Sequence, residues 1–133
     1  MKTNLKKVFA LIFAVMFVFC FAACGEKKAP VIGISQYGQH GSLDNCREGF
    51  LQGLKDAGLV EGTDYTIDYQ NAGFDDNITK QIAESFSANN VALMCGIATN
   101  SATACYAAAE NKDIPVIFTA ITTRYRPSWI PAM

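Results

Sequence analysis

Three short polar residues, Thr99-Asn100-Ser101, stand between an apolar segment and an alanine-rich segment and are the best placed for binding chemistry. The alanine-rich segment predicts a helix, and the first N–H groups of a helix have no partner inside it. These N–H groups and the helix dipole attract an anion, and the hydroxyls of Thr99 and Ser101 add donors, so a carboxylate would fit well. Side-chain capping by Thr99 or Ser101 would explain the same residues without any ligand.

The polar residues 36–41 form a second candidate site, because they lie between an apolar segment and a predicted helix. A dinucleotide-binding loop would need the pattern G-x-G-x-x-G, and the first turn glycine of that pattern is absent here. His40 and Cys46 could be imagined as a base and a nucleophile, but Cys46 falls on the apolar side of the helix that follows. We therefore expect no enzyme active site, and His40 is either a functional or a solvated loop residue.

Both candidates belong to a repeated unit of apolar strand, polar loop and amphipathic helix. Residues 31–35 are continuously apolar up to Ser35 and predict a strand that is buried on both faces of a parallel sheet. Ser42 is placed as the N-cap of the following helix, and Gly58 is placed to end it. Apolar residues recur at helical spacing between these two signals, at Leu43, Cys46, Phe50, Leu51 and Leu54.

The unit repeats along the chain, with strands predicted at residues 65–69, 91–97 and 116–121. Helices are predicted from Asp75 or Asp76 and over residues 102–110. Short apolar strands with helical crossovers imply an α/β fold with a doubly wound parallel sheet, for which we predict the order 2-1-3-4. The carboxyl ends of parallel strands share one edge, so residues 36–41, 99–101 and 119–122 should gather there, with Thr119 and Thr122 flanking the end of the fourth strand.

Composition narrows the possible functions further. The 133 residues carry a formal net charge of −1, which gives no electrostatic footprint for nucleic acid. A single His makes a metal site poorly supported, and no cofactor is expected. Cys46 and Cys95 lie in apolar patterns and are interpreted as buried, inert thiols.

The N-terminus has the organisation of a secretory signal peptide. Lysines at positions 2, 6 and 7 precede an apolar run over residues 8–24, which is somewhat short for a spanning helix, although an uncleaved anchor is the alternative. Phe21-Ala22-Ala23-Cys24-Gly25 resembles the bacterial lipobox, with Phe21 where Leu is more usual. The resemblance implies a signal peptide over residues 1–23, lipid attachment at Cys24, a tether over 24–30 and a location on the extracytoplasmic face of the cell membrane.

Several segments between Ala29 and Thr122 resemble one family in order and spacing. They are residues 29–36, 47–50, 53–58, 67–72, 97–99, 113–116 and 118–122. The chain is similar to the lipoprotein substrate-binding components of ABC importers of the tryptophan/tyrosine-binding type. The resemblance implies a type I periplasmic-binding fold, in which two α/β lobes close over a small ligand, and residues 31–122 would be the N-terminal lobe.

The resemblance also implies a function and a set of site residues. The protein would capture a small, aromatic amino acid for an ABC permease, and would bind the membrane through its lipid anchor. Ser35, Gln36 and His40 would line the cleft, Thr99, Asn100 and Ser101 would bind the ligand's carboxylate, and Thr119 to Thr122 would make the last contact before the second lobe. The alternative is a stand-alone flavodoxin-like lipoprotein module that binds a nucleotide or a protein partner.

The sequence departs from the family after Thr122, where the second lobe would begin. One choice of synonymous codons for residues 122–129, read one base out of frame, gives Asp-Pro-Val-Pro-Ala-Glu-Leu, which is similar to the family's continuation. Residues 123–133 also show neither a strand nor a helix period. We therefore expect them to be an out-of-frame tail, and we expect the chain to be a truncated fragment that is inactive in transport.

The lipid anchor can be tested by metabolic labelling with a palmitate analogue. The wild-type chain should be labelled and Cys24→Ala should not, because the lipobox chemistry modifies only the Cys24 thiol. Labelling that persists in Cys24→Ala would place the lipid on another residue and contradict the lipobox assignment.

Overall fold

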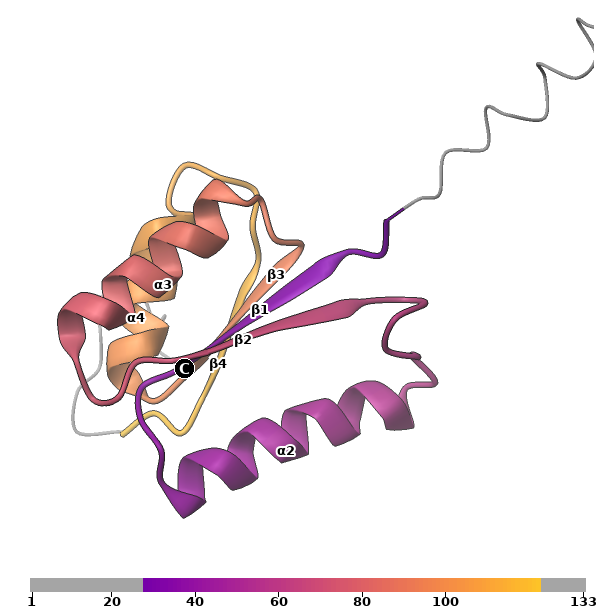
Figure 1. Ribbon diagram of the computed structural model, residues 1–133, viewed down its shortest axis with the longest axis horizontal. Coiled ribbons are helices and arrows are strands. Elements are labelled where there is room, and N and C mark those ends of the chain that lie inside the picture. Colours follow the sequence, from indigo (N-terminus) through magenta and orange to yellow (C-terminus); the bar gives the residue numbers. More distant parts are fainter. Residues whose placement is uncertain (1–27, 123–133) are drawn as a thin grey trace, which may run out of the picture.

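Residues 28–122 are described by the structure, a computed structural model, and they form four parallel strands that alternate with three helices (Figure 1). The predicted signal peptide, the lipid attachment at Cys24 and the tail over residues 123–133 lie outside these residues. The elements in chain order are β1 (Val31–Gln36), α2 (Gly41–Asp56), β2 (Thr66–Asn71), α3 (Asp76–Ala88), β3 (Leu93–Ile97), α4 (Thr99–Ala109) and β4 (Val116–Thr119).

The sheet has the order β2-β1-β3-β4, so the predicted fold class and strand order are confirmed. Strand β1 lies in the middle, and its Ile34 pairs with Tyr69 of β2 on one side and with Cys95 of β3 on the other. All but the first residue of β1 are buried, as the continuous apolar run predicts. Strand β2 alternates in its polarity and lies at the sheet edge, which is also as predicted.

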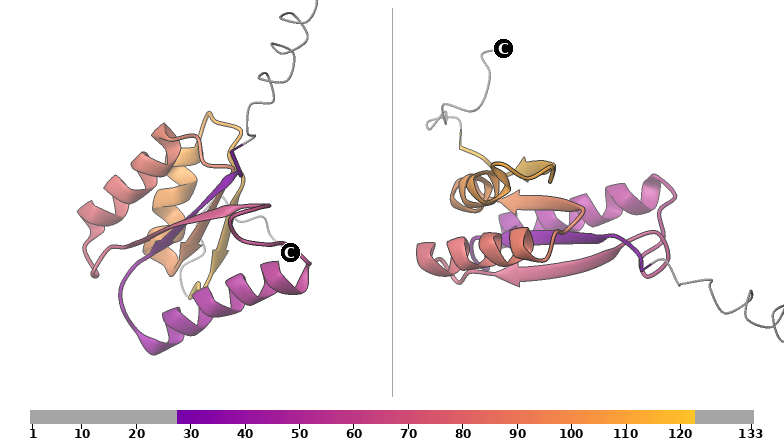
Figure 2. Two further views of the ribbon diagram at one scale, coloured as in Figure 1. Left: turned by 45° about the vertical axis from the view of Figure 1, so that its right-hand side comes forward. Right: turned by 90° about the horizontal axis from the view of Figure 1, so that it is seen from above.

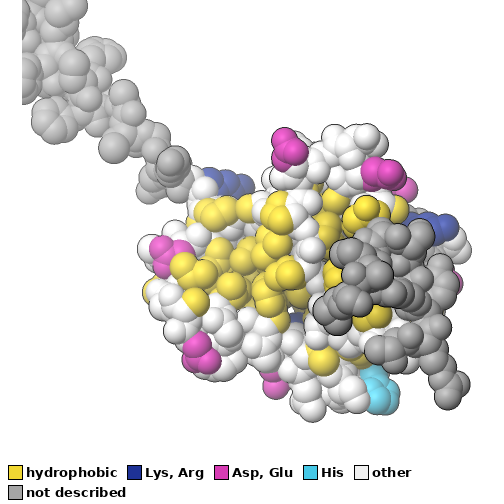
Figure 3. Space-filling model, turned by 180° about the vertical axis from the view of Figure 1, so that it is seen from behind, with side chains coloured by type: hydrophobic (Ala, Val, Ile, Leu, Met, Phe, Trp, Pro, Cys, Tyr) yellow, Lys and Arg dark blue, Asp and Glu magenta, His cyan; other side chains and the backbone are white. Residues whose placement is uncertain are grey.

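The helices cover the two faces of the sheet unequally. Helices α3 and α4 lie side by side on one face, and α2 lies alone on the other (Figures 1 and 2). The α3–α4 face is closed around Phe86, whose ring takes the space where a Cβ of Gly33 would stand, with 2.7 Å between them. No residue of α2 is fully buried, and the space-filling view from behind shows a broad area of apolar side chains (Figure 3). Ile117 of the outer strand β4 is 42% exposed.

Two helix starts test the predicted caps. Helix α2 begins at Gly41, two residues earlier than a cap at Ser42 would allow, so the N-cap is His40 and the assignment of this role to Ser42 is wrong. His40 has the extended backbone of a cap, and its Nδ1 accepts a hydrogen bond from the Ser42 N–H at 3.3 Å. Helix α3 is capped by Asp75, whose Oδ1 accepts from two backbone N–H groups at 2.7 and 3.0 Å.

Gly96 on β3 determines how closely α4 approaches the sheet. A Cβ at Gly96 would lie 2.6 Å from the Cα of Ala102 and 2.7 Å from its backbone nitrogen, which is closer than any packed atoms can come. Only glycine therefore allows the first turn of α4 to rest directly on the strand that precedes it. This contact places the start of α4 at the carboxyl edge of the sheet.

Replacement of glycine by alanine should have opposite effects on the free energy of unfolding at positions 96 and 49. Gly96→Ala should lower it by about 1–3 kcal/mol, because the new methyl group collides with the backbone of α4. Gly49→Ala, in the exposed middle of α2 with no atom within 4 Å of the new methyl group, should raise it by about 0.5–1 kcal/mol. Urea unfolding followed by circular dichroism measures both. Equal effects of the two substitutions would contradict the close approach at Gly96.

Candidate functional site

The loops that follow β1, β3 and β4 gather at the carboxyl edge of the sheet, as the sequence predicts. The Tyr37 N–H donates to the carbonyl oxygen of Ile97 at 3.2 Å, and the Ala98 N–H donates to that of Thr119 at 3.1 Å. The Thr99 and Thr122 hydroxyl oxygens lie 3.5 Å apart, and the Thr122 N–H donates to Thr99 Oγ1 at 3.4 Å. Two of the predicted binding segments are thus in direct contact.

Helix α4 begins without a side-chain cap. It starts at Thr99, three residues earlier than predicted, and its N-cap is Ala98, whose side chain cannot accept a hydrogen bond. Capping by Thr99 or Ser101, the reading that needs no ligand, is therefore wrong. Ala98 has a φ of 82°, a strained conformation for a residue with a Cβ. The first-turn N–H groups are left without a side-chain acceptor, and the positive end of the dipole faces the sheet edge.

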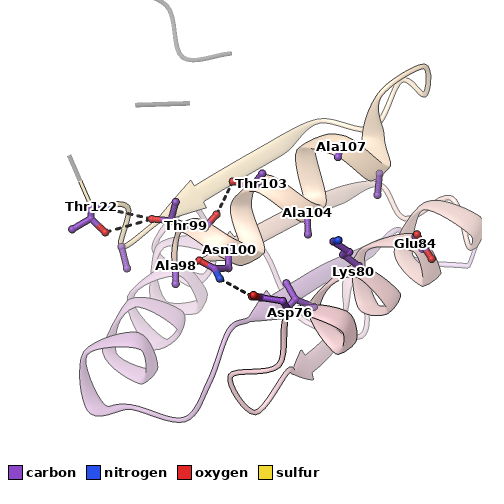
Figure 4. A pocket seen from close by; sticks show the side chains of 13 residues that line it. Asp76, Lys80, Glu84, Ala98, Thr99, Asn100, Thr103, Ala104, Ala107 and Thr122 are labelled. Carbon is purple, nitrogen blue, oxygen red and sulfur yellow. Dashed lines mark hydrogen bonds between the residues drawn. The ribbon is translucent and has the colours of Figure 1, made fainter. Parts of the chain in front are cut away.

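A carboxylate lies beside this helix terminus. Asp76, the first residue of α3, accepts a hydrogen bond at 2.7 Å from the side-chain amide of Asn100 on α4 (Figure 4). The bond to Asn100, followed by the interaction with the Tyr37 hydroxyl, holds the pKa of Asp76 below its usual value. Asp76 in turn raises the pKa of Tyr37, chiefly because the Tyr37 hydroxyl donates a hydrogen bond to the Asp76 carboxylate. The ionised form of Asp76 is thus the one that the site stabilises.

Sequence reasoning considered Asp76 only as a possible helix cap and missed it as a site residue. A signal was present, because Asp76 follows β2 and the carboxyl end of β2 lies at the same sheet edge. The pair Asp75-Asp76 supplies one carboxylate to cap α3 and leaves the other for the site.

A groove of about 850 Å³ runs from this edge between α3 and α4, a volume within the range of small-molecule sites (Figure 4). Asp76, Thr99, Asn100 and Thr122 line its end at the sheet edge. Alanines of α4 line the rest, together with charged residues of α3. Thr99, Asn100 and Thr122 are the predicted site residues that this groove brings together.

Ser35 and Ser101, two other predicted site residues, are fully buried. Both side chains are 0% exposed, and neither hydroxyl makes a hydrogen bond of good geometry. Ser101 therefore presents its backbone N–H at the helix terminus, while its hydroxyl points away from solvent. Thr119 is partly exposed, and His40 is exposed as the cap of α2.

Gln36 is also fully buried, and Arg47 of α2 holds it in place. Arg47 Nη1 donates to the side-chain oxygens of Gln36, Asp44 and Tyr69 at 3.0–3.1 Å, and its guanidinium lies 4.7 Å from the centre of the Tyr69 ring. The Gln36 amide donates in turn to the Gly38 carbonyl and to Asp44, both at 2.8 Å. This network fixes the loop after β1. It could not be predicted from the sequence, because its members come from three different elements.

The two fully buried cysteines within residues 28–122, Cys95 and Cys105, show no feature of a reactive site. Burial raises the pKa of Cys95 to about 11 and that of Cys105 to about 12, so both thiols stay protonated at neutral pH. Cys46 is partly buried rather than fully buried. Within residues 28–122, no group of three His, Cys, Asp or Glu side chains could hold a metal ion, and no helix is long and apolar enough to span a membrane.

Comparison with known proteins relates this architecture to one family. Residues 31–127 match the family model described as ABC transporter substrate binding protein. A tyrosine-binding protein of Clostridioides difficile is 44% identical over 97 residues, which are 73% of this chain and 28% of that protein. These matches confirm the family resemblance expected from the sequence.

Solved structures give the same result. A ligand-free, open substrate-binding protein with adhesive properties from Clostridium difficile is 38% identical with a TM-score of 0.67. An ABC domain in complex with L-Trp from Streptococcus pneumonia is 34% identical with a TM-score of 0.65. Each match covers 71% of this chain and 31% of the other. The chain thus spans about a third of the length of these relatives.

The Asp76–Asn100 contact should be visible in a carboxyl-carbon NMR titration. The pKa of Asp76 should lie below 3.8 in the wild type and rise in Asn100→Ala, because the amide donor is lost. A lowered folded-state pKa means that ionised Asp76 stabilises the fold above the unfolded-state pKa, and that this contribution disappears as the pH falls through the folded-state pKa. Asn77→Ala, which leaves both partners of Asp76 in place, is the control. An unchanged pKa in Asn100→Ala would contradict the contact.

Proposed function

Because the chain belongs to the family of ABC transporter substrate-binding proteins, we propose that it forms the lobe of such a protein that holds a small amino acid for delivery to an ABC permease. An aromatic amino acid is the favoured ligand. This is supported by the relative described as a tyrosine-binding protein and by the neighbouring structure in complex with L-Trp. The proposed role is binding rather than catalysis.

The observation that carries the proposal is the pairing of the uncapped terminus of α4 with Asp76. The terminus offers N–H donors and the positive end of a dipole, and Asp76 offers a negative charge, linked to it through Asn100 at 2.7 Å. An amino acid is a zwitterion, with a carboxylate and an ammonium group on one carbon. The two complementary charges of the site are therefore close enough together to be met by the two charges of one amino acid.

The proposed roles of the site residues follow from their positions. The N–H groups of Thr99, Asn100 and Ser101 bind the ligand's carboxylate, and the linked hydroxyls of Thr99 and Thr122 add hydrogen bonds. Asp76 binds the ammonium group. His40 and Thr119 lie at the surface and are proposed for the rim of the site. Ser35 and Gln36 are fully buried at the end of β1 and support the loop that follows it.

A second lobe would complete the site in the whole protein. One open edge covers only one side of a ligand, whereas small-molecule sites bury most of the ligand surface. We propose that the remaining part of the family's fold, absent from residues 28–122, closes over this edge. We also propose that the protein is attached through Cys24 to the extracytoplasmic face of the membrane, as the lipobox resemblance implies.

A nucleotide-binding flavodoxin-like module is the competing function, and the two ligand classes make different demands on Asp76. A carboxylate at the sheet edge attracts an ammonium group and repels a phosphate. The pairing of Asp76 with the helix terminus therefore favours an amino acid over a nucleotide.

Ligand-observed NMR with L-tyrosine, L-tryptophan and AMP tests the proposal on the purified chain. The two amino acids should bind and AMP should not. Asp76→Asn should weaken amino-acid binding several-fold, because the ligand's ammonium group loses its counter-charge, although solvent screens that attraction at an exposed edge. Glu110→Gln removes the same charge at the far end of α4 and should leave binding unchanged. Binding of AMP without either amino acid would overturn the proposed function in favour of the nucleotide module.

A further inference from the structure

Phe74 is a large apolar side chain that the fold leaves uncovered at the binding edge. It lies in the loop between β2 and α3, two residues before Asp76, and is 54% exposed. Neither apolar core cluster among the described residues includes it. The ring therefore does little to hold the fold together, and its presence calls for another explanation.

The backbone at Phe74 is also unfavourable for this residue type. The Asp75 N–H donates to the Ala72 carbonyl at 3.0 Å, which closes a four-residue turn with Gly73 and Phe74 in its centre. Both central residues have positive φ, 60° for Gly73 and 67° for Phe74. Turns of this kind select Gly, Asn or Asp, so a phenylalanine costs conformational energy that an asparagine would not. Strain retained at an exposed residue points to a function of its side chain.

The surroundings hold the Phe74 ring in one position. The Phe74 N–H donates to the Tyr37 carbonyl at 2.7 Å, and the two rings meet edge to face with their centres 5.6 Å apart. A Cβ at Gly38 would lie 2.3 Å from the Phe74 ring, so the ring lies flat against a residue that has no side chain. Three loop residues thus form a rigid support for one exposed aromatic face.

This aromatic pair adjoins the charged part of the site. Tyr37 contacts the Asp76 carboxylate through its hydroxyl, and Asp76 contacts Asn100 at the start of α4. A chain of contacts therefore leads from the Phe74 ring through Tyr37 to the Asp76 carboxylate and on to the start of α4. An aromatic amino acid presents the same groups, because its ring is one methylene group away from the carbon that carries its two charges.

We propose that Phe74, supported by Tyr37, is the specificity-determining residue that selects ligands with an aromatic side chain. This inference rests on the proposed function, since it assigns the ring of the ligand to a position beside the charged groups already described. The ligand ring packs against the exposed face of Phe74 in an offset or edge-to-face contact.

The test compares the dissociation constants of L-tryptophan and L-alanine for the full chain and for Phe74→Asn, measured by ligand-observed NMR titration. Phe74→Asn should weaken L-tryptophan binding by roughly three- to tenfold, the range that an aromatic pair contributes, and L-alanine binding by less than twofold. The midpoint of urea unfolding should be unchanged or raised, because asparagine suits the turn better. Val60→Asn is the control, since Val60 is 57% exposed at the opposite end of the sheet.

Each other outcome has a defined meaning. The inference is overturned if the wild type binds both amino acids and Phe74→Asn leaves their affinities unchanged, or weakens them equally. The proposed function then stays intact. A wild type that binds neither amino acid overturns the proposed function and this inference with it. If Phe74→Asn lowers the unfolding midpoint, Phe74→Leu decides. Phe74→Leu keeps the apolar surface and should still lose affinity selectively for L-tryptophan. If that selective loss is absent, the inference is overturned.

Discussion

The close approach of α4 to β3 over Gly96 is the constraint on which the binding edge depends. Because no Cβ separates them, the helix starts directly after the strand, with only Ala98 between the two. Ala98 is the N-cap of α4, has a φ of 82°, and carries no side-chain acceptor for the first N–H groups of the helix. The strained residue and the open helix terminus thus lie together beside the contact at Gly96. The first N–H groups of α4 therefore stay without the side-chain acceptor that caps many helices, which is the feature on which the proposed anion site depends.

The sequence predicted the framework of the fold better than its details. Continuous apolar runs and helical spacing were sufficient for the parallel sheet, its order and the shared edge of the loops, because burial on both faces leaves a clear pattern. The cap of α2 was misassigned because Ser42 is the commoner capping residue, whereas the histidine two residues earlier has the extended backbone that a cap needs. A propensity cannot reveal which residue adopts that conformation.

The part of the site that could not be predicted consists of contacts between distant loops. Asp76 meets Asn100 across 24 residues, and Arg47 meets Tyr69 across 22. Such pairs leave no periodic trace in one sequence. Phe74 is different, because a phenylalanine after Gly73 in a polar turn is a local anomaly that sequence reasoning could have noticed. Its positive φ, which gives that anomaly its meaning, required the structure.

Under the proposed function, the open edge gives a second lobe a part in affinity as well as in coverage of the ligand. Asp76 is exposed and Tyr37 is partly exposed at this edge, and attraction between charges is strongly screened there. A lobe that closed over the edge would exclude water, and the same helix terminus and carboxylate would then interact with a zwitterion in a lower dielectric. The hydrophobic contribution of the Phe74 ring would increase for a related reason, because its exposed face would be buried only when the ligand and the second lobe cover it. Under the proposed function, the described lobe would set the geometry of recognition, and closure by the second lobe would supply most of its strength.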